Sequence, residues 1–256
     1  MRVTGARELL TGMRLAVTLL TAIPLPGAGP PPTRRAAAAA MAWAPVIGLA
    51  LGGAAAGLIV LLDYGGRSGP LLAAAVALAA LAALSRGLHL DGLADLADGL
   101  GSRRPAAAAL EIMRRPDIGP YGVATLVLTL LLQVAALARA QELGRGPAAV
   151  IVAAVTGRLA ITWACRRAVP AARPSGLGAL VAGTQHPGVP AALTAALLAG
   201  SAAAGPILAA AAAAGLALSW LVTRLAVRRL GGITGDVLGA LTEIATAACL
   251  LVTALH

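Results

Sequence analysis

Long apolar runs with almost no charge constrain this chain more than any other feature. Seven of them lie at about 40–62, 70–88, 118–138, 147–168, 190–205, 207–228 and 236–255. Most approach the roughly 20 residues that a helix needs to cross the hydrocarbon core of a bilayer, and Gly205-Pro206 permits a turn between the two Ala-rich runs. Charged residues make up only 12% of the chain. The sequence predicts one all-α domain over 1–256, a polytopic membrane bundle of about seven transmembrane helices.

The distribution of arginine predicts the orientation of these helices. All 20 basic residues are Arg, and the formal net charge is +10. With the N-terminus inside, 16 arginines lie in cytoplasmic segments and 3 in outer segments, while Arg158 lies within a span. The positive-inside rule accounts for this bias. A basic chain can also bind nucleic acid, but with no Phe and only 2 Tyr no nucleic-acid partner is expected.

The N-terminal 30 residues allow two interpretations. Arginines precede the apolar run 15–20, as they do in a secretory signal. However, Arg14 directly adjoins this run, and Pro24 and Pro26 follow it closely. We therefore favour an N-terminal interfacial or re-entrant helix.

Seven of the ten acidic residues form three groups, on cytoplasmic segments or at the cytoplasmic ends of spans. In the first, Asp91, Asp95 and Asp98 are spaced i, i+4 and i+7, so a helix places them on one face. Carboxylates stacked in this way repel one another unless a cation lies among them, and hard oxygen ligands suit Mg²⁺ or Mn²⁺. A solvated acidic helix end is the alternative.

The last group is Asp236 and Glu243, again i and i+7, with the small Gly239 and Ala240 between them. A carboxylate stripe with small neighbours leaves room for a metal or a phosphate. The sequence Thr234-Gly-Asp also predicts a polar cap at the start of the last span. Capping explains Asp236 but does not explain Glu243.

The middle group combines acids with arginines. Glu111 and Asp117 flank Arg114 and Arg115, and guanidinium groups suit phosphate recognition. Positive-inside placement explains these two arginines nearly as well. Arg158 differs, because a charge within a span is costly and is by default functional or paired with a carboxylate.

Together these patterns predict metal-dependent phosphotransfer at the inner face, since metal ions that neutralise phosphate charge are the recurring parts of that chemistry. A membrane transporter is the alternative, although its acidic residues should lie near the middle of the bilayer and its halves should show a repeat. A non-catalytic scaffold would need no stacked carboxylates.

The sequence also resembles the cobalamin synthase family, the adenosylcobinamide-GDP ribazoletransferases, nearly end to end. The most specific string is His89-Leu-Asp-Gly-Leu-Ala-Asp-Leu-Ala-Asp-Gly99, and the resemblance continues through Ile118-Gly-Pro-Tyr-Gly122 and Thr234-Gly-Asp-Val-Leu-Gly-Ala240. It implies that α-ribazole or its 5′-phosphate is joined to adenosylcobinamide-GDP with release of GMP, in a Mg²⁺-dependent step that forms adenosylcobalamin or its 5′-phosphate. The cytoplasmic (inner) membrane is the implied location, with an active-site loop at about 86–122. A homo-oligomer is compatible with the sequence, which does not fix the oligomeric state.

The roles that follow are hypotheses. Asp91, Asp95, Asp98 and Asp236 would hold Mg²⁺. Asp98, or else His89, would accept the proton of the attacking hydroxyl, although His89 would equally cap a helix or orient a carboxylate. Further substrate contacts are expected from Arg114, Arg158, Glu111, Asp117 and Glu243.

Overall fold

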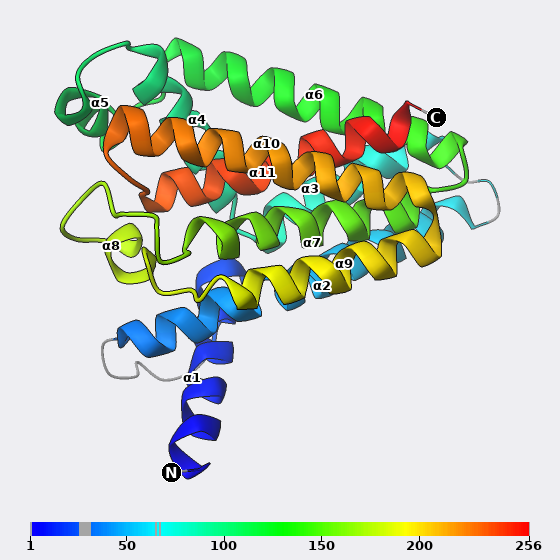
Figure 1. The fold of residues 1–256 in the computed structure, drawn as a ribbon. Coiled ribbons are helices and arrows are strands. Elements are labelled where there is room, and N and C mark those ends of the chain that lie inside the picture. The colour runs from blue at the N-terminus through cyan, green and yellow to red at the C-terminus, as the bar shows by residue number, and fades with distance from the viewer. Residues whose placement is uncertain (1, 26–31, 65, 67, 256) are drawn as a thin grey trace.

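The computed structural model describes residues 2–25, 32–64, 66 and 68–255, and within these residues it contains only helices (Figure 1). In chain order they are α1 (Arg2–Leu20), α2 (Arg34–Asp63), α3 (Pro70–Leu84), α4 (Leu88–Gly101), α5 (Ala106–Ile112), α6 (Pro120–Glu142), α7 (Gly146–Ala164), α8 (Leu177–Val181), α9 (Gly188–Ala204), α10 (Pro206–Leu230) and α11 (Gly235–Ala254). The predicted all-α class is confirmed.

Five helices, α2, α6, α7, α10 and α11, are long and apolar enough to cross a membrane. α9 is apolar but has only 17 residues, and α3 passes the same test only together with α4. Each of the seven expected spans therefore contains a helix, and five or six satisfy the length criterion. α4 is bent by 88° from α3, so it does not continue the crossing, and we treat it as lying outside the spans.

The bundle helices alternate in direction. α2, α6, α9 and α11 begin at one end of the bundle, whereas α3, α7 and α10 begin at the other (Figure 1). The first end, which we call the site end, also carries α4, α5 and α8. α1 lies across the bundle helices rather than along them (Figure 1), which agrees with the geometry of an interfacial helix; that assignment stays a prediction.

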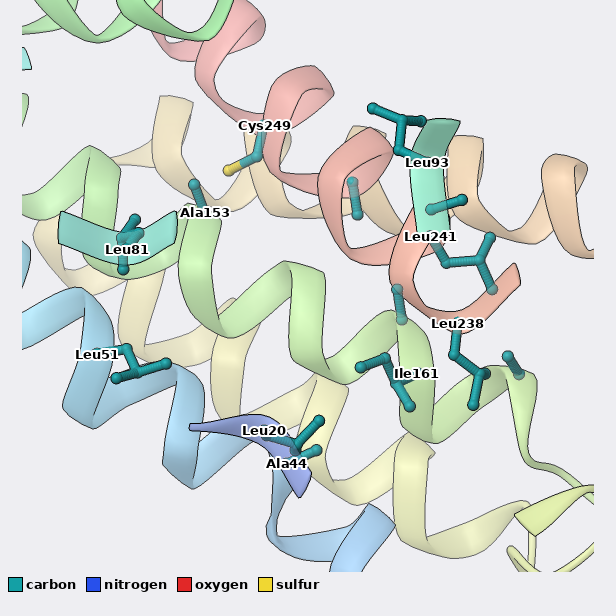
Figure 2. Close-up of a cluster of buried hydrophobic side chains, with 14 of the residues drawn as sticks. Leu20, Ala44, Leu51, Leu81, Leu93, Ala153, Ile161, Leu238, Leu241 and Cys249 are labelled. Atoms are coloured by element: carbon teal, nitrogen blue, oxygen red, sulfur yellow. The ribbon is translucent and has the colours of Figure 1, made fainter. Parts of the chain in front are cut away.

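Small residues allow these helices to pack closely. A Cβ added at Gly48 of α2 would lie 2.6 Å from the carbonyl oxygen of Ala154 on α7. Between the helices, larger side chains such as Ile161 of α7, Leu238 of α11 and Leu93 of α4 fill a common core (Figure 2). Close backbone approach through small residues is the usual packing mode of membrane helices.

Candidate active site

The crossing of α4 over α11 builds the centre of the candidate site. A Cβ on Gly92 would lie 2.6 Å from the carbonyl oxygen of Asp236, and a Cβ on Gly239 would lie 3.2 Å from the Cα of His89. The two backbones therefore meet where neither helix has a side chain. This contact brings the carboxylate face of α4 next to the first turn of α11.

The first turn of α11 is held by the predicted polar cap. The hydroxyl of Thr234 accepts the Val237 N–H at 3.2 Å and donates to Oδ2 of Asp236 at 3.1 Å. Nη1 of Arg173 lies 3.5 Å from the same oxygen. The cap prediction at Thr234 is confirmed, and the carboxylate of Asp236 is held in place from two sides.

The sequence interpretation gave Arg173 no role in the site. It lies between α7 and α8, with no local pattern that separates it from the other arginines of the site end. Its Nη2 donates to the carbonyl oxygen of Leu110 at 2.7 Å, and Nε is buried without a hydrogen-bond partner among the described residues. Only the tertiary fold brings this arginine to Asp236.

The electrostatics of Asp95 show how close the carboxylates are. Burial, and then the charges of Asp91, Asp236 and Asp98, together raise the pKa of Asp95 to about 7 against the opposing charge of Arg173. A cation would relieve this repulsion. Among the described residues, no three His, Cys, Asp or Glu side chains already converge as a metal cage. This donor set fits Mg²⁺, which is usually held by one or two carboxylates, waters and substrate phosphates.

The structure gives Asp98 a role that the sequence did not predict. Its Oδ2 accepts the Gly119 N–H at 2.7 Å and its Oδ1 accepts the Gly122 N–H at 2.9 Å. These amides belong to the first turn of α6, whose N–H groups lack partners within the helix. Asp98 is therefore a cap for α6, and its predicted roles as a metal ligand and as a proton acceptor stay predictions.

His89 lines a cavity of about 180 Å³ together with Asp91 and Asp236. The imidazole is 2% exposed, and both ring nitrogens lack a hydrogen-bond partner among the described residues. Burial, and then the charge of Arg158, lowers the pKa of His89 well below its ordinary value, so the ring is neutral near pH 7. In the described structure no side chain caps the start of α4, so the alternative that His89 caps this helix is wrong.

Arg158 and Glu243 lie apart from this surface, within the bundle. Both line a cavity of about 20 Å³ between α3, α6, α7 and α11, which is the size of a single water site. Nε2 of Gln133 donates to Oε2 of Glu243 at 2.9 Å, and Arg158 is close enough to interact electrostatically with Glu243. This position favours the predicted alternative of pairing with a carboxylate, and a cavity of this size is too small for the substrate contacts expected of either residue.

The middle group of the sequence lies beyond Arg173. Nη1 of Arg114 donates to Oε1 of Glu111 at 3.0 Å, and both residues line a second cavity of about 360 Å³ with Arg173. Asp117 is exposed and lines none of the cavities named here. Glu111 and Arg114 are thus brought near the carboxylates, and Asp117 is not.

Comparison with known proteins decides the family. Residues 12–254 match the family described as cobalamin-5-phosphate synthase. The chain belongs to this family. It is 48% identical to the adenosylcobinamide-GDP ribazoletransferase of Frankia casuarinae over 94% of both chains. Relatives with the same name in Nocardioides sp. (41% identity, 93% of this chain and 96% of the relative) and Bradyrhizobium diazoefficiens (37%, 97% and 95%) are also similar. No solved structure matches significantly.

In this member of the cobalamin-5-phosphate synthase family, the close contact between α4 and α11 at Gly92 should not tolerate even one added carbon atom. We expect Gly92→Ala to lower the free energy of unfolding by about 1–3 kcal/mol, the usual cost of overpacking, because the new Cβ meets backbone rather than a mobile side chain. Thermal unfolding in detergent measures this. The control is Gly53→Ala, where a Cβ meets nothing within 4 Å; equal melting temperatures for the two variants would contradict the close crossing.

Proposed function

We propose that this protein is an adenosylcobinamide-GDP ribazoletransferase of the cytoplasmic membrane. It would join a ribose hydroxyl that is free in both α-ribazole and its 5′-phosphate to the corrinoid-side phosphorus of adenosylcobinamide-GDP. One P–O bond forms, the P–O bond to GMP breaks, and the acceptor proton passes to a base. The family match over residues 12–254, which includes the carboxylates of α4 and α11, carries this proposal.

The arrangement of the site supports a division of roles. Asp91, Asp95 and Asp236 would hold Mg²⁺, which when bound neutralises charge on the diphosphate. His89 lines the same cavity with unpartnered nitrogens, so we prefer it as the proton acceptor. Asp98 accepts two amide hydrogen bonds, and we assign it to positioning α6.

Charge at the two ends of the bundle supports a cytoplasmic site. Paired arginines occur at the site end at 34–35, 103–104, 114–115 and 166–167, whereas the other end has Arg139 and Arg145 in its described part. A transporter would be expected to keep a substrate-sized cavity near its charges in the middle of the bundle. The cavity at Arg158 and Glu243 measures only about 20 Å³.

The test is turnover by the purified protein in detergent. With adenosylcobinamide-GDP, α-ribazole and Mg²⁺, we expect stoichiometric GMP and adenosylcobalamin; EDTA should stop the reaction and added Mg²⁺ should restore it. Turnover that persists in EDTA would exclude the metal assignment. An absence of GMP release from an intact, folded preparation would exclude the transferase.

A further inference from the structure

A cavity of about 360 Å³ lies between α5 and the segment that follows α7, next to the carboxylate site. Ala107 and Ala108 of α5 and Pro174 of that segment line it with aliphatic surface. Its charged groups are few, and they come from both elements. An apolar slot with a few convergent polar groups is the usual form of a small-molecule site.

Arg173 separates this cavity from the carboxylates. Its Nη1 lies 3.5 Å from Asp236 and its Nη2 is bonded to Leu110, while Nε is buried without a partner in the described part of the chain. The guanidinium is thus fixed in place between the carboxylates and this cavity. Arg114 supplies a second guanidinium to the same cavity, and such groups bind phosphate oxygens well.

Glu111 supplies the acceptor of the cavity. Within the described part of the chain its carboxylate is paired only with Arg114, and the side chains of Glu111 and Arg114 are 67% and 49% exposed, so the pair is weak. A carboxylate accepts hydrogen bonds and donates none. Guanine presents two donors, N1–H and N2–H, on one edge, whereas adenine presents an acceptor at N1. The cavity therefore has the polarity that selects guanine.

We propose that this cavity binds the guanosine monophosphate half of the substrate, with Glu111 selecting the guanine edge and Arg173 and Arg114 holding the phosphate. The inference rests on the proposed function and adds the site of its leaving group. The diphosphate would then extend from this cavity past Arg173, which places the corrinoid-side phosphorus beside Asp236. The acceptor alcohol would approach from the opposite side, through the cavity lined by His89.

The experiment compares GMP and AMP as inhibitors of turnover. For the wild-type protein we expect GMP to inhibit at about 10- to 100-fold lower concentration than AMP, as the loss of one charged hydrogen-bonding group implies. Glu111→Ala should remove most of this preference. Arg114→Ala should weaken inhibition by GMP and inhibition by AMP to the same extent, because the Arg114 side chain would contact the phosphate and not the base.

The matched control is Glu142→Ala. Glu142 pairs with Arg139 at 2.8 Å with the same i,i+3 spacing and similar exposure, at the other end of the bundle, so this variant should keep the full preference for GMP. An unchanged GMP/AMP ratio in Glu111→Ala would overturn the inference while leaving the transferase intact. If the wild-type protein shows no turnover, the proposed function fails. Equilibrium dialysis with GMP and AMP then measures separately whether the protein binds GMP more tightly than AMP.

Discussion

Asp95→Asn is expected to reduce transfer on the order of 10³-fold or more, the scale of losing a group that neutralises transition-state charge, and at the same time to stabilise the metal-free protein. The two effects share one cause. Burial and the neighbouring carboxylates raise the pKa of Asp95 to about 7, so its ionised form is unfavourable unless a cation is present. Asparagine keeps the shape and removes the charge.

The sign of the pH dependence follows from the raised pKa. A carboxyl group whose pKa is higher in the folded protein than in the unfolded chain destabilises the folded protein as the pH rises above the unfolded pKa. For Asp95 this destabilisation is fully present above about pH 7. In EDTA, the gain in melting temperature from Asp95→Asn should therefore be larger at pH 8 than at pH 6.

The control for this experiment is Asp63→Asn. Asp63 is an exposed residue at the C-terminal end of α2, at the end of the bundle opposite the site end. This variant should change neither turnover nor melting temperature at either pH. A purely structural Asp95 would show the reverse pattern, in which asparagine lowers the melting temperature and activity falls only with the amount of folded protein. Saturation with Mg²⁺ should stabilise the wild-type protein and have little effect on Asp95→Asn.

Local patterns in the sequence predicted most of the fold. Apolar runs located the spans, Gly205-Pro206 separated α9 from α10, and Thr234 marked the start of α11, because each signal depends only on neighbouring residues. The bend of 88° after α3 was not predicted. Gly87 has a positive φ of 65° there, but a glycine in sequence does not specify the direction in which the next helix leaves.

The relative placement of the candidate site residues was predicted where they share a helix turn and missed where they do not. Asp91 and Asp95 were correctly placed on one face, since i,i+4 spacing fixes that locally. Asp236 and Glu243 also share a face, but seven residues of helix separate them by about 10 Å, so Glu243 lies within the bundle instead. Arg173 and Gln133 reach the charged groups only through tertiary packing, for which the sequence carries no local signal.

The second large effect concerns stability. Arg158 and Glu243 interact electrostatically within the bundle. Replacing either one, as Arg158→Met or Glu243→Leu, is expected to lower the free energy of unfolding by about 3–5 kcal/mol, because the other charge loses its compensation inside the bundle. Arg158 is 3% exposed, and Glu243 is bonded to Gln133 within the same cluster. The cavity beside the charge that remains has room for about one water molecule, so that charge would be poorly solvated.

The double variant Arg158→Met/Glu243→Leu should recover most of this loss, since two apolar side chains of similar volume replace a buried pair at little cost. Unfolding in mixed detergent micelles, analysed as a double-mutant cycle, measures the coupling. The exposed pair of Arg139 and Glu142 is the control, and its coupling should stay below about 1 kcal/mol. Additive losses at 158 and 243 would show that the two charges do not compensate each other.

Turnover of the double variant then distinguishes the two roles of this pair. If Arg158 and Glu243 contacted substrate, as the sequence predicted, removing both would abolish transfer even in a stable protein. Their position around a cavity of about 20 Å³ leads us to expect the opposite result. The folded double variant should lose no more than about 10- to 100-fold in kcat, the range of effects transmitted through supporting residues rather than through contact with substrate. The two intramembrane charges would then compensate each other within the bundle, beneath the site where the carboxylates of α4 and α11 meet.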